Sequence, residues 1–385
     1  MIYLDNAATT KIAPEVLKAM MPYLMDEYGN AGSLCSLGRS AATAVQKARE
    51  QVATLFGCAP DHVVFTSGGS ESNNTVFKGL RDRLLEREKK HLIVSAIEHD
   101  SVLRAAETLT KDGFYITYIK PSSDGRILPK AVEAAIQEDT GLVSVMFVNN
   151  ETGVTNDINE IGRICRQNEV LFHTDCIQAA GQHPLSVHKN DVDFASVSSH
   201  KIHGPKGVGA LYVREQNLVP LICGGSEQEF GLRGGTENVP GIVGFGAAAE
   251  IAVNCMHDDL ITVSMAKQKF YMELLNELDN YDVGGALHVN GGSAIDPGKT
   301  INLRFDGVDA QTLLLALDSI GVCVSTGSAC RSHESEPSHV LTAMGLTEDE
   351  ARSSIRVSFS KYNTVSEAEN VAKSMAAYVY TLKHR

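Results

Sequence analysis

Long apolar runs, paired cysteines and an excess of positive charge are all missing from this sequence of 385 residues. No stretch approaches the ~20 continuous apolar residues of a membrane span. The formal net charge of -13 argues against a general affinity for nucleic acid or for an anionic membrane, because both need a basic surface. We therefore expect partners among small molecules and other proteins.

The eight cysteines are scattered and include no CxxC pair. They suggest neither a disulfide framework nor a zinc site, so no metal is expected and most should be buried, reduced thiols. The N-terminal residues 1–5 also lack a basic region followed by an apolar one, as a secretory signal would have. We expect a cytoplasmic protein.

Helical stretches alternate with short apolar runs between about residues 40 and 215. Helices are predicted over 41–56 and 72–89, and strands over 63–66, 91–95, 142–148, 170–174, 194–198 and 207–213. Several strands are almost wholly apolar, as strands covered on both faces must be. The pattern predicts an α/β fold with a mostly parallel central sheet.

After a predicted helix over 241–255 the pattern changes. Helices over 260–278, 310–319 and 365–382 now alternate with strands over 299–305, 322–325 and 355–359, which suggests a smaller α+β domain. We predict a large domain of residues 15–255 and a small domain of residues 1–14 and 256–385.

Three segments carry groups suited to an aldehyde cofactor with a phosphate. Lys201 follows a strand, where its amine can form an imine, although a lysine in a glycine-rich surface loop is the plainer reading. Asp175 also ends a strand and can pair with a pyridine nitrogen, or simply cap a helix. The turn Thr66–Asn74 leads into a helix whose N-terminus suits a phosphate, or is only capped.

Read together, the ordered motifs resemble the NifS/IscS type of cysteine desulfurase. The resemblance runs from residue 3 to about 375 through Tyr3–Thr10, Thr66–Glu71, Glu98-His99, Asn149–Gly153, His173–Asp175, His200-Lys201, Arg233–Asn238 and Ser325–Cys330. It implies a fold-type-I, class V aminotransferase-like homodimer that uses pyridoxal 5′-phosphate.

The resemblance also implies a role for each matching residue. Lys201 would hold the cofactor and move protons, and His99 would stack on its ring and serve in acid/base steps. Asn150 and Arg356 would bind the substrate carboxylate, for which a guanidinium fork is well shaped. The remaining cofactor contacts would come from Gly69, Ser70, Asp175, Gln178, Ser198, His200 and, toward the partner subunit, Thr236. Taken singly, His99, Asn150 and Arg356 also fit a loop histidine, a turn former and a surface ion pair.

Cys330 lies among small residues and before a polar run, which describes an exposed loop rather than a core position for a thiol. Arg331, His333 and His339 are placed to favour its thiolate. The matching family cysteine receives sulfur, so the resemblance implies that L-cysteine becomes L-alanine while Cys330 becomes a persulfide. An acceptor protein would then take the sulfur for iron–sulfur cluster assembly or for tRNA or DNA thiolation.

Other readings stay open from the sequence. A selenocysteine lyase or another class V aminotransferase would use a similar site, and a non-catalytic adaptor would keep only the fold. Cys35 replaces a family histidine, and we hypothesise that it is a second sulfur-handling thiol. The last predicted helix finishes close to Arg385, without the further tail by which scaffold-feeding members dock, so the acceptor remains open.

Overall fold

The computed structural model describes residues 1–224, 228–293, 296–326 and 337–384. Its strands are β1 (Ile2–Tyr3), β2 (Val63–Thr66), β3 (His91–Ser95), β4 (Tyr115–Ile119), β5 (Thr140–Ser144), β6 (Leu171–Asp175), β7 (Phe194–Ser198), β8 (Gly209–Val213), β9 (Leu287–Val289), β10 (Thr300–Phe305), β11 (Val322–Cys323) and β12 (Ser354–Ser358). Its α-helices are α1 (Pro14–Met25), α2 (Ser36–Phe56), α3 (Gly69–Glu86), α4 (Asp100–Leu109), α5 (Pro129–Ala135), α6 (Ile158–Gln167), α7 (Val239–Asn280), α8 (Ala310–Ser319), α9 (His339–Ala343), α10 (Glu348–Arg352) and α11 (Val365–Lys383).

The larger lobe is built on a seven-stranded sheet of order β2-β8-β7-β6-β5-β3-β4, in which β8 runs antiparallel to both of its neighbours. The other pairings are parallel. Helices α3 and α4 cover one face, while α2, α5, α6 and the start of α7 cover the other. Successive strand residues divide between the two cores, as Val63 and Val64 do, so the predicted α/β fold with a mostly parallel sheet is confirmed.

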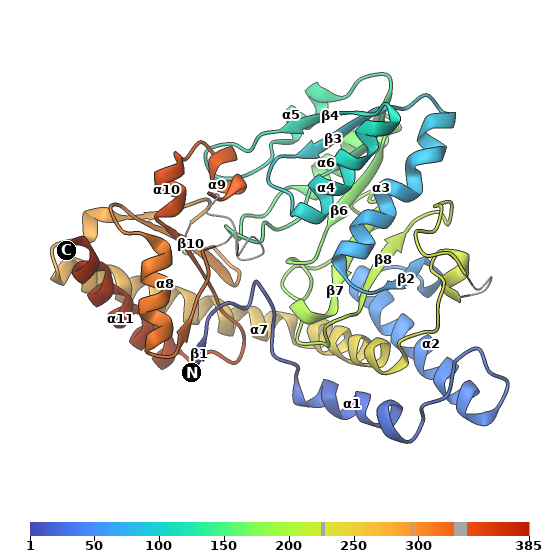
Figure 1. The fold of residues 1–385 in the computed structure, drawn as a ribbon, viewed down its shortest axis with the longest axis horizontal. Helices are drawn as coiled ribbons and strands as arrows, with labels where there is room; N and C mark the ends of the chain where they lie inside the picture. The colour runs from blue at the N-terminus through green and yellow to red at the C-terminus, as the bar shows by residue number, and fades with distance from the viewer. Residues whose placement is uncertain (225–227, 294–295, 327–336, 385) are drawn as a thin grey trace.

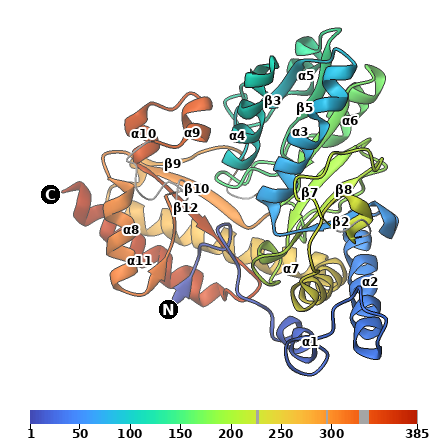
Figure 2. The ribbon, with the colours of Figure 1, turned by 45° about the vertical axis from the view of Figure 1, so that its right-hand side comes forward.

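The smaller lobe holds the antiparallel sheet β12-β10-β9 and the short parallel pair β1-β11 (Figure 2). Its core is formed with α8, α11 and the second half of α7. Leu4 is fully buried in this core, so the N-terminal segment crosses from the small lobe to α1. The predicted boundary at residue 255 falls inside α7 and stays a prediction.

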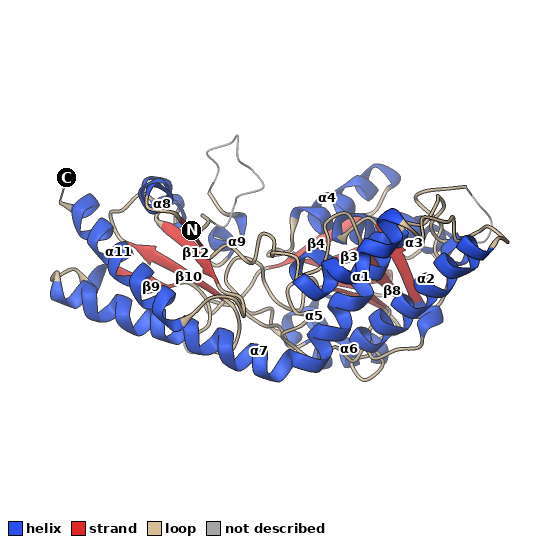
Figure 3. Ribbon diagram, turned by 90° about the horizontal axis from the view of Figure 1, so that it is seen from below, coloured by secondary structure: helices blue, strands red, loops and turns tan. Residues whose placement is uncertain are grey.

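Helix α7 is one continuous helix, so the prediction of two helices over 241–255 and 260–278 is wrong. The polar residues between them, His257-Asp258-Asp259, include no glycine or proline to end a helix. Figures 1 and 3 show α7 running beneath both lobes. This helix is long and apolar enough to cross a membrane. Half of its most apolar 18-residue stretch is buried inside the protein, however, as in a core helix.

Several strand predictions differ from the structure in detail. The edge strand β4 was not predicted, because Tyr115–Ile119 is half exposed and lacks the apolar run of the inner strands. The predicted strand 142–148 ends at Ser144 as a regular strand, although Val145 and Phe147 still donate to the backbone oxygens of His173 and Asp175 in β6. Beyond it, Met146 and Asn150 line the cavity between the lobes.

Candidate active site

A cavity of about 320 Å³ lies where the carboxyl ends of β6 and β7 and the N-terminus of α3 face the small lobe. Parallel strands bring their carboxyl ends to one edge of a sheet, and this edge is where α/β proteins bind ligands. The cavity is lined by the predicted site residues Gly69, Ser70, His99, Asn150, Asp175, Gln178, Ser198, His200, Lys201 and Arg356. The structure therefore brings together residues from both lobes that the sequence separates by up to 287 positions.

Five predicted residues are not part of this arrangement. Cys330 lies outside the described residues, as do Arg331 and His333. Thr236 is exposed and does not line the cavity, so its contact with the cofactor phosphate of a partner subunit stays a prediction. Cys35 is an exposed residue at the N-cap of α2 and is likewise absent from the cavity wall.

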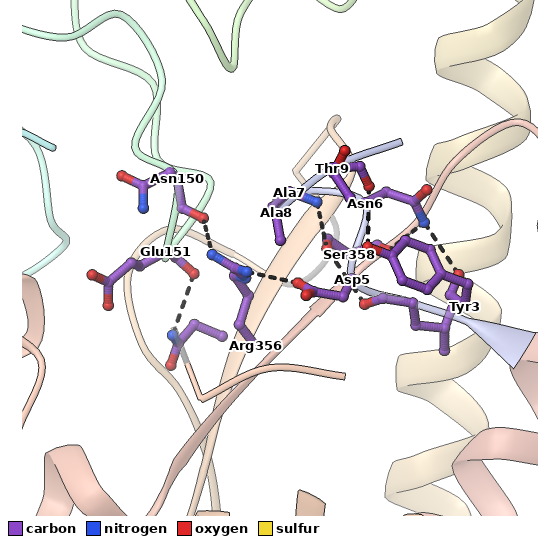
Figure 4. Close-up of polar contacts among 12 residues, drawn as sticks. Tyr3, Asp5, Asn6, Ala7, Ala8, Thr9, Asn150, Glu151, Arg356 and Ser358 are labelled. Atoms are coloured by element: carbon purple, nitrogen blue, oxygen red, sulfur yellow. Dashed lines mark hydrogen bonds and ion pairs between the residues drawn. The ribbon is translucent and has the colours of Figure 1, made fainter. Parts of the chain in front are cut away.

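Lys201 ends the short 3-10 turn Ser199–Lys201, directly after β7. Its Nζ donates to the carbonyl oxygens of Ala7 and Ala8, at 2.6 and 2.7 Å. Those two carbonyls belong to the N-terminal segment, where the Ala7 N–H donates to Ser358 Oγ of β12 (Figure 4). The amine is thus held at the cavity wall rather than in a surface loop.

Asp175 is the last residue of β6 and is buried against the cavity. One carboxylate oxygen accepts from the Ile177 N–H at 2.9 Å and the other from Asn73 Nδ2 at 2.9 Å. No α-helix follows it before β7, so the alternative that Asp175 caps a helix is wrong, although it does cap a turn. Burial raises the pKa of its carboxyl, against these hydrogen bonds and the charges of His99 and Lys201.

A hydrogen-bond chain connects Asp175 with His99, which is the N-cap of α4. Asn73 Nδ2 donates to Asp175 and also to Ser101 Oγ at 2.9 Å. The N–H of Ser101 donates to His99 Nδ1 at 3.1 Å, and its Oγ lies 2.8 Å from the same nitrogen. Because Nδ1 accepts, the proton of the neutral ring is on Nε2. Ser101 was not predicted from the sequence, where its only signal is its place in the first turn after the His99 cap.

Gly69, Ser70, Ser198 and His200 form a polar corner at the N-terminus of α3. A Cβ atom on Gly69 would lie 2.0 Å from Ile177 Cδ1, so a larger residue here would require the end of the Ile177 side chain to move. Burial, helped by the charges of Lys201, Lys206 and Lys299, lowers the pKa of His200 to about 4. His200 is therefore neutral at pH 7, and its Nδ1 lies 3.0 Å from Thr9 Oγ1.

Arg356 is buried between the lobes on β12, so it is not a surface ion-pair residue. Its Nη2 pairs with Asp5 at 2.6 Å, and Nη1 donates to the backbone oxygen of Asn150 at 3.1 Å (Figure 4). Its Nε has no hydrogen-bond partner among the described residues. The two terminal nitrogens are thus oriented by the protein, while the N–H of Nε is buried without a partner there.

The chain on either side of residues 327–336 is fixed at this site. Before them, Ser325 exchanges two backbone hydrogen bonds with Arg356. After them, Ser338 Oγ donates to the buried Glu151 carboxylate at 2.6 Å, and His339 Nε2 donates to the Glu98 carbonyl at 2.9 Å. Both ends of the segment that contains Cys330 are therefore attached to the cavity wall.

Residues 2–371 match the family described as aminotransferase class-V, whose enzymes depend on pyridoxal phosphate. The match covers nearly the whole chain and both lobes of the fold. The chain belongs to this family.

Within the family, its relatives are cysteine desulfurases. The cysteine desulfurase IscS of Anaeromyxobacter dehalogenans is 43% identical over 385 residues, with 99% of this chain and 93% of the relative covered. A solved NifS-like protein has a TM-score of 0.88 and 36% identity, with 98% of each chain covered. The structure of SspA in complex with cysteine has a TM-score of 0.82 and 38% identity, with 94% of this chain and 100% of that chain covered. The resemblance predicted from the sequence motifs is confirmed.

Proposed function

We propose that this chain removes sulfur from L-cysteine with pyridoxal 5′-phosphate, leaving L-alanine, and receives the sulfur on Cys330 as a persulfide. The observation that carries the proposal is the meeting of Lys201, Asp175, His99 and Arg356 around one cavity. The likeness to cysteine desulfurases over the whole chain favours this reaction over transamination. A selenocysteine substrate would fit the same groups, but no residue of the described site favours it.

The residues present fit the cofactor. Asp175 is a buried carboxylate held by two donors, which suits a protonated pyridine nitrogen. Gln178 donates from Nε2 to the Ala7 oxygen, and its Oε1 is buried without a partner, so it offers an acceptor to a ring hydroxyl. The corner of Gly69, Ser70, Ser198 and His200 provides backbone and side-chain donors for a phosphate at a helix N-terminus. When bound, the cofactor supplies an electron sink for the substrate Cα.

The remaining roles follow from contacts of the chain itself. Lys201 Nζ, already held by two carbonyls, binds the cofactor and moves the Cα proton. His99 carries a proton on Nε2, which it can donate as an acid and take back as a base. Arg356 and Asn150 both line the cavity and receive the substrate carboxylate, with the guanidinium oriented by Asp5.

Cys330 completes the reaction in our proposal. Its thiolate forms a bond with the substrate sulfur while the bond from that sulfur to Cβ breaks, and Cβ ends as the methyl group of alanine. L-cysteine and one thiol give L-alanine and one persulfide, so atoms and electrons balance without an outside oxidant. The anchors at Ser325 and Ser338 tether the segment at the cavity wall, and an acceptor protein then takes the sulfur.

Several wider features belong to the same proposal. The enzyme works as a homodimer in which Thr236 serves the partner's phosphate site, and it is cytoplasmic, in agreement with the free thiols of its described cysteines. Residues 15–255 act as the large domain and residues 1–14 and 256–385 as the small one. The acceptor belongs to iron–sulfur cluster assembly or to tRNA or DNA thiolation.

The test measures alanine and sulfide released from L-cysteine in the presence of a reductant. Equal amounts of both are expected from the wild-type protein, and Lys201→Ala and Cys330→Ser should each lose sulfide release. Lys206→Ala and Cys323→Ser are the controls, because they change a lysine and a cysteine that do not line the cavity. Both variants should retain sulfide release. A Cys330→Ser variant with full sulfide release would contradict the persulfide proposal but leave the cofactor proposal standing.

A further inference from the structure

Lys299 is a buried lysine that directly precedes β10 and lies behind Lys201. It lines a second cavity, of about 60 Å³, which also contains Lys201 in its wall. Because Lys201 lines both cavities, it separates the larger cavity from the one that holds Lys299. No sequence motif pointed to Lys299.

The ammonium of Lys299 has no carboxylate partner within the part of the chain that the structure describes. Its backbone N–H donates to Gln182 Oε1 at 3.0 Å and its carbonyl accepts from Phe359, but neither contact involves Nζ. By contrast, Lys361 on the same cavity pairs with Asp259 at 2.9 Å. A buried ammonium without a counter-charge is costly, and burial first, then the charges of Lys201 and Arg356, lowers the pKa of Lys299 to about 7.

The surroundings of Lys299 are mostly basic. The charged and titratable groups near it on the other elements are Lys201, Arg356, His183, His200, His203 and the ion pair of Lys361 with Asp259. The histidines are kept neutral by burial, with Lys299 adding to the effect. The net charge facing Lys201 from this side is therefore positive, and anions bound in the larger cavity would favour the charged form of Lys299.

We propose that Lys299 is a positioning residue of the active site, whose ammonium repels a proton on Lys201 Nζ and so favours the neutral amine that the reaction needs. The inference rests on the proposed function, because it assigns Lys201 the role of proton carrier. The carbonyls of Ala7 and Ala8 act in the opposite direction, since they accept from Lys201 and favour its charged form. Lys299 offsets that preference.

The test is a pH titration of the visible absorption of the cofactor-loaded protein, which reports the proton on Lys201 Nζ. Lys299→Met removes the charge with an unbranched side chain of similar length, and its midpoint should lie about one pH unit above the wild-type midpoint. Lys299→Arg keeps a permanent charge, and its midpoint should lie at or below the wild-type value. The pH midpoint is therefore expected to be highest in Lys299→Met, lower in the wild-type protein and no higher than that in Lys299→Arg.

Lys267→Met is the matched control. Lys267 is also a buried lysine with a lowered pKa, of about 8, but it donates to the Asp296 carbonyl and lines neither cavity. Its variant should titrate at the wild-type pH. A Lys299→Met midpoint equal to that of wild type, or shifted equally in Lys267→Met, overturns the inference. A wild-type protein that shows no band dependent on Lys201 instead overturns the proposed function itself.

Discussion

At the scale of single residues, His99 is oriented by the hydroxyl of Ser101, whose Oγ lies 2.8 Å from Nδ1 of the ring. Ser101 connects it to Asn73 and Asp175. We expect Ser101→Ala to lower kcat about fivefold while the protein still takes up cofactor, because one net hydrogen bond is worth roughly 1 kcal/mol. Steady-state kinetics and the absorbance of the loaded protein measure the two effects separately. Ser101→Thr keeps the hydroxyl and should keep most of the activity; equal losses in both variants would argue against the hydrogen bond.

The protonation state of Glu98 depends on its burial. Its Oε1 accepts from Ser95 Oγ and the Met146 N–H, while Oε2 is buried without a partner. Burial raises the pKa of Glu98 from 4.5 to about 8, so the folded protein holds a proton there that the unfolded chain loses. Between these pH values the free energy of unfolding should fall as pH rises, by about 1.4 kcal/mol for each pH unit.

Glu98→Gln should remove this contribution, because the amide is neutral at every pH and keeps the oxygen that accepts both bonds. The stability of the variant relative to wild type should therefore increase between pH 5 and pH 8. Urea unfolding at the two pH values measures the difference. A relative stability that is the same at both would mean that Glu98 is ionised in the folded protein.

At the scale of the elements, α7 has the largest structural role, since its two halves pack on two different cores. Asp258 is an exposed residue near the middle of this helix. We expect Asp258→Pro to cost about 3 kcal/mol or more, because proline removes a backbone hydrogen bond and clashes with the preceding turn. Asp258→Ala, which keeps the helix, should change the urea midpoint little. A proline variant as stable as the alanine variant would show that the two halves do not need a continuous helix.

At the scale of the whole molecule, the two lobes meet at the residues that flank Cys330. Ser338, next to α9, donates to Glu151 of the larger lobe. We expect Ser338→Ala to reduce persulfide formation on Cys330 on the order of tenfold, because a displaced nucleophile loses its alignment, while cofactor uptake is unchanged. Mass spectrometry of the protein after mixing with L-cysteine measures the persulfide. Ser319→Ala, an exposed serine of α8, is the control, and an undiminished persulfide in Ser338→Ala would contradict the anchoring role.

Much of the fold follows from local patterns. The strands 63–66, 91–95 and 194–198 were predicted with the bounds that the structure has, because fully buried strands read as apolar runs. The edge strand β4 and the continuity of α7 were not predicted. Half-exposed strands carry a weak apolar signal, and a polar helix turn looks like a break unless packing on both sides is known.

The sequence by itself determined the α/β class, the family and most of the residues that line the larger cavity, because most of these motifs lie near the end of a strand or the start of a helix. Only the tertiary structure decided that Asp5 orients Arg356, that Ser101 orients His99 and that Lys299 lies behind Lys201. These contacts join distant segments or depend on side-chain direction. Burial and electrostatic coupling depend on how these segments pack in three dimensions, so no local pattern could reveal them.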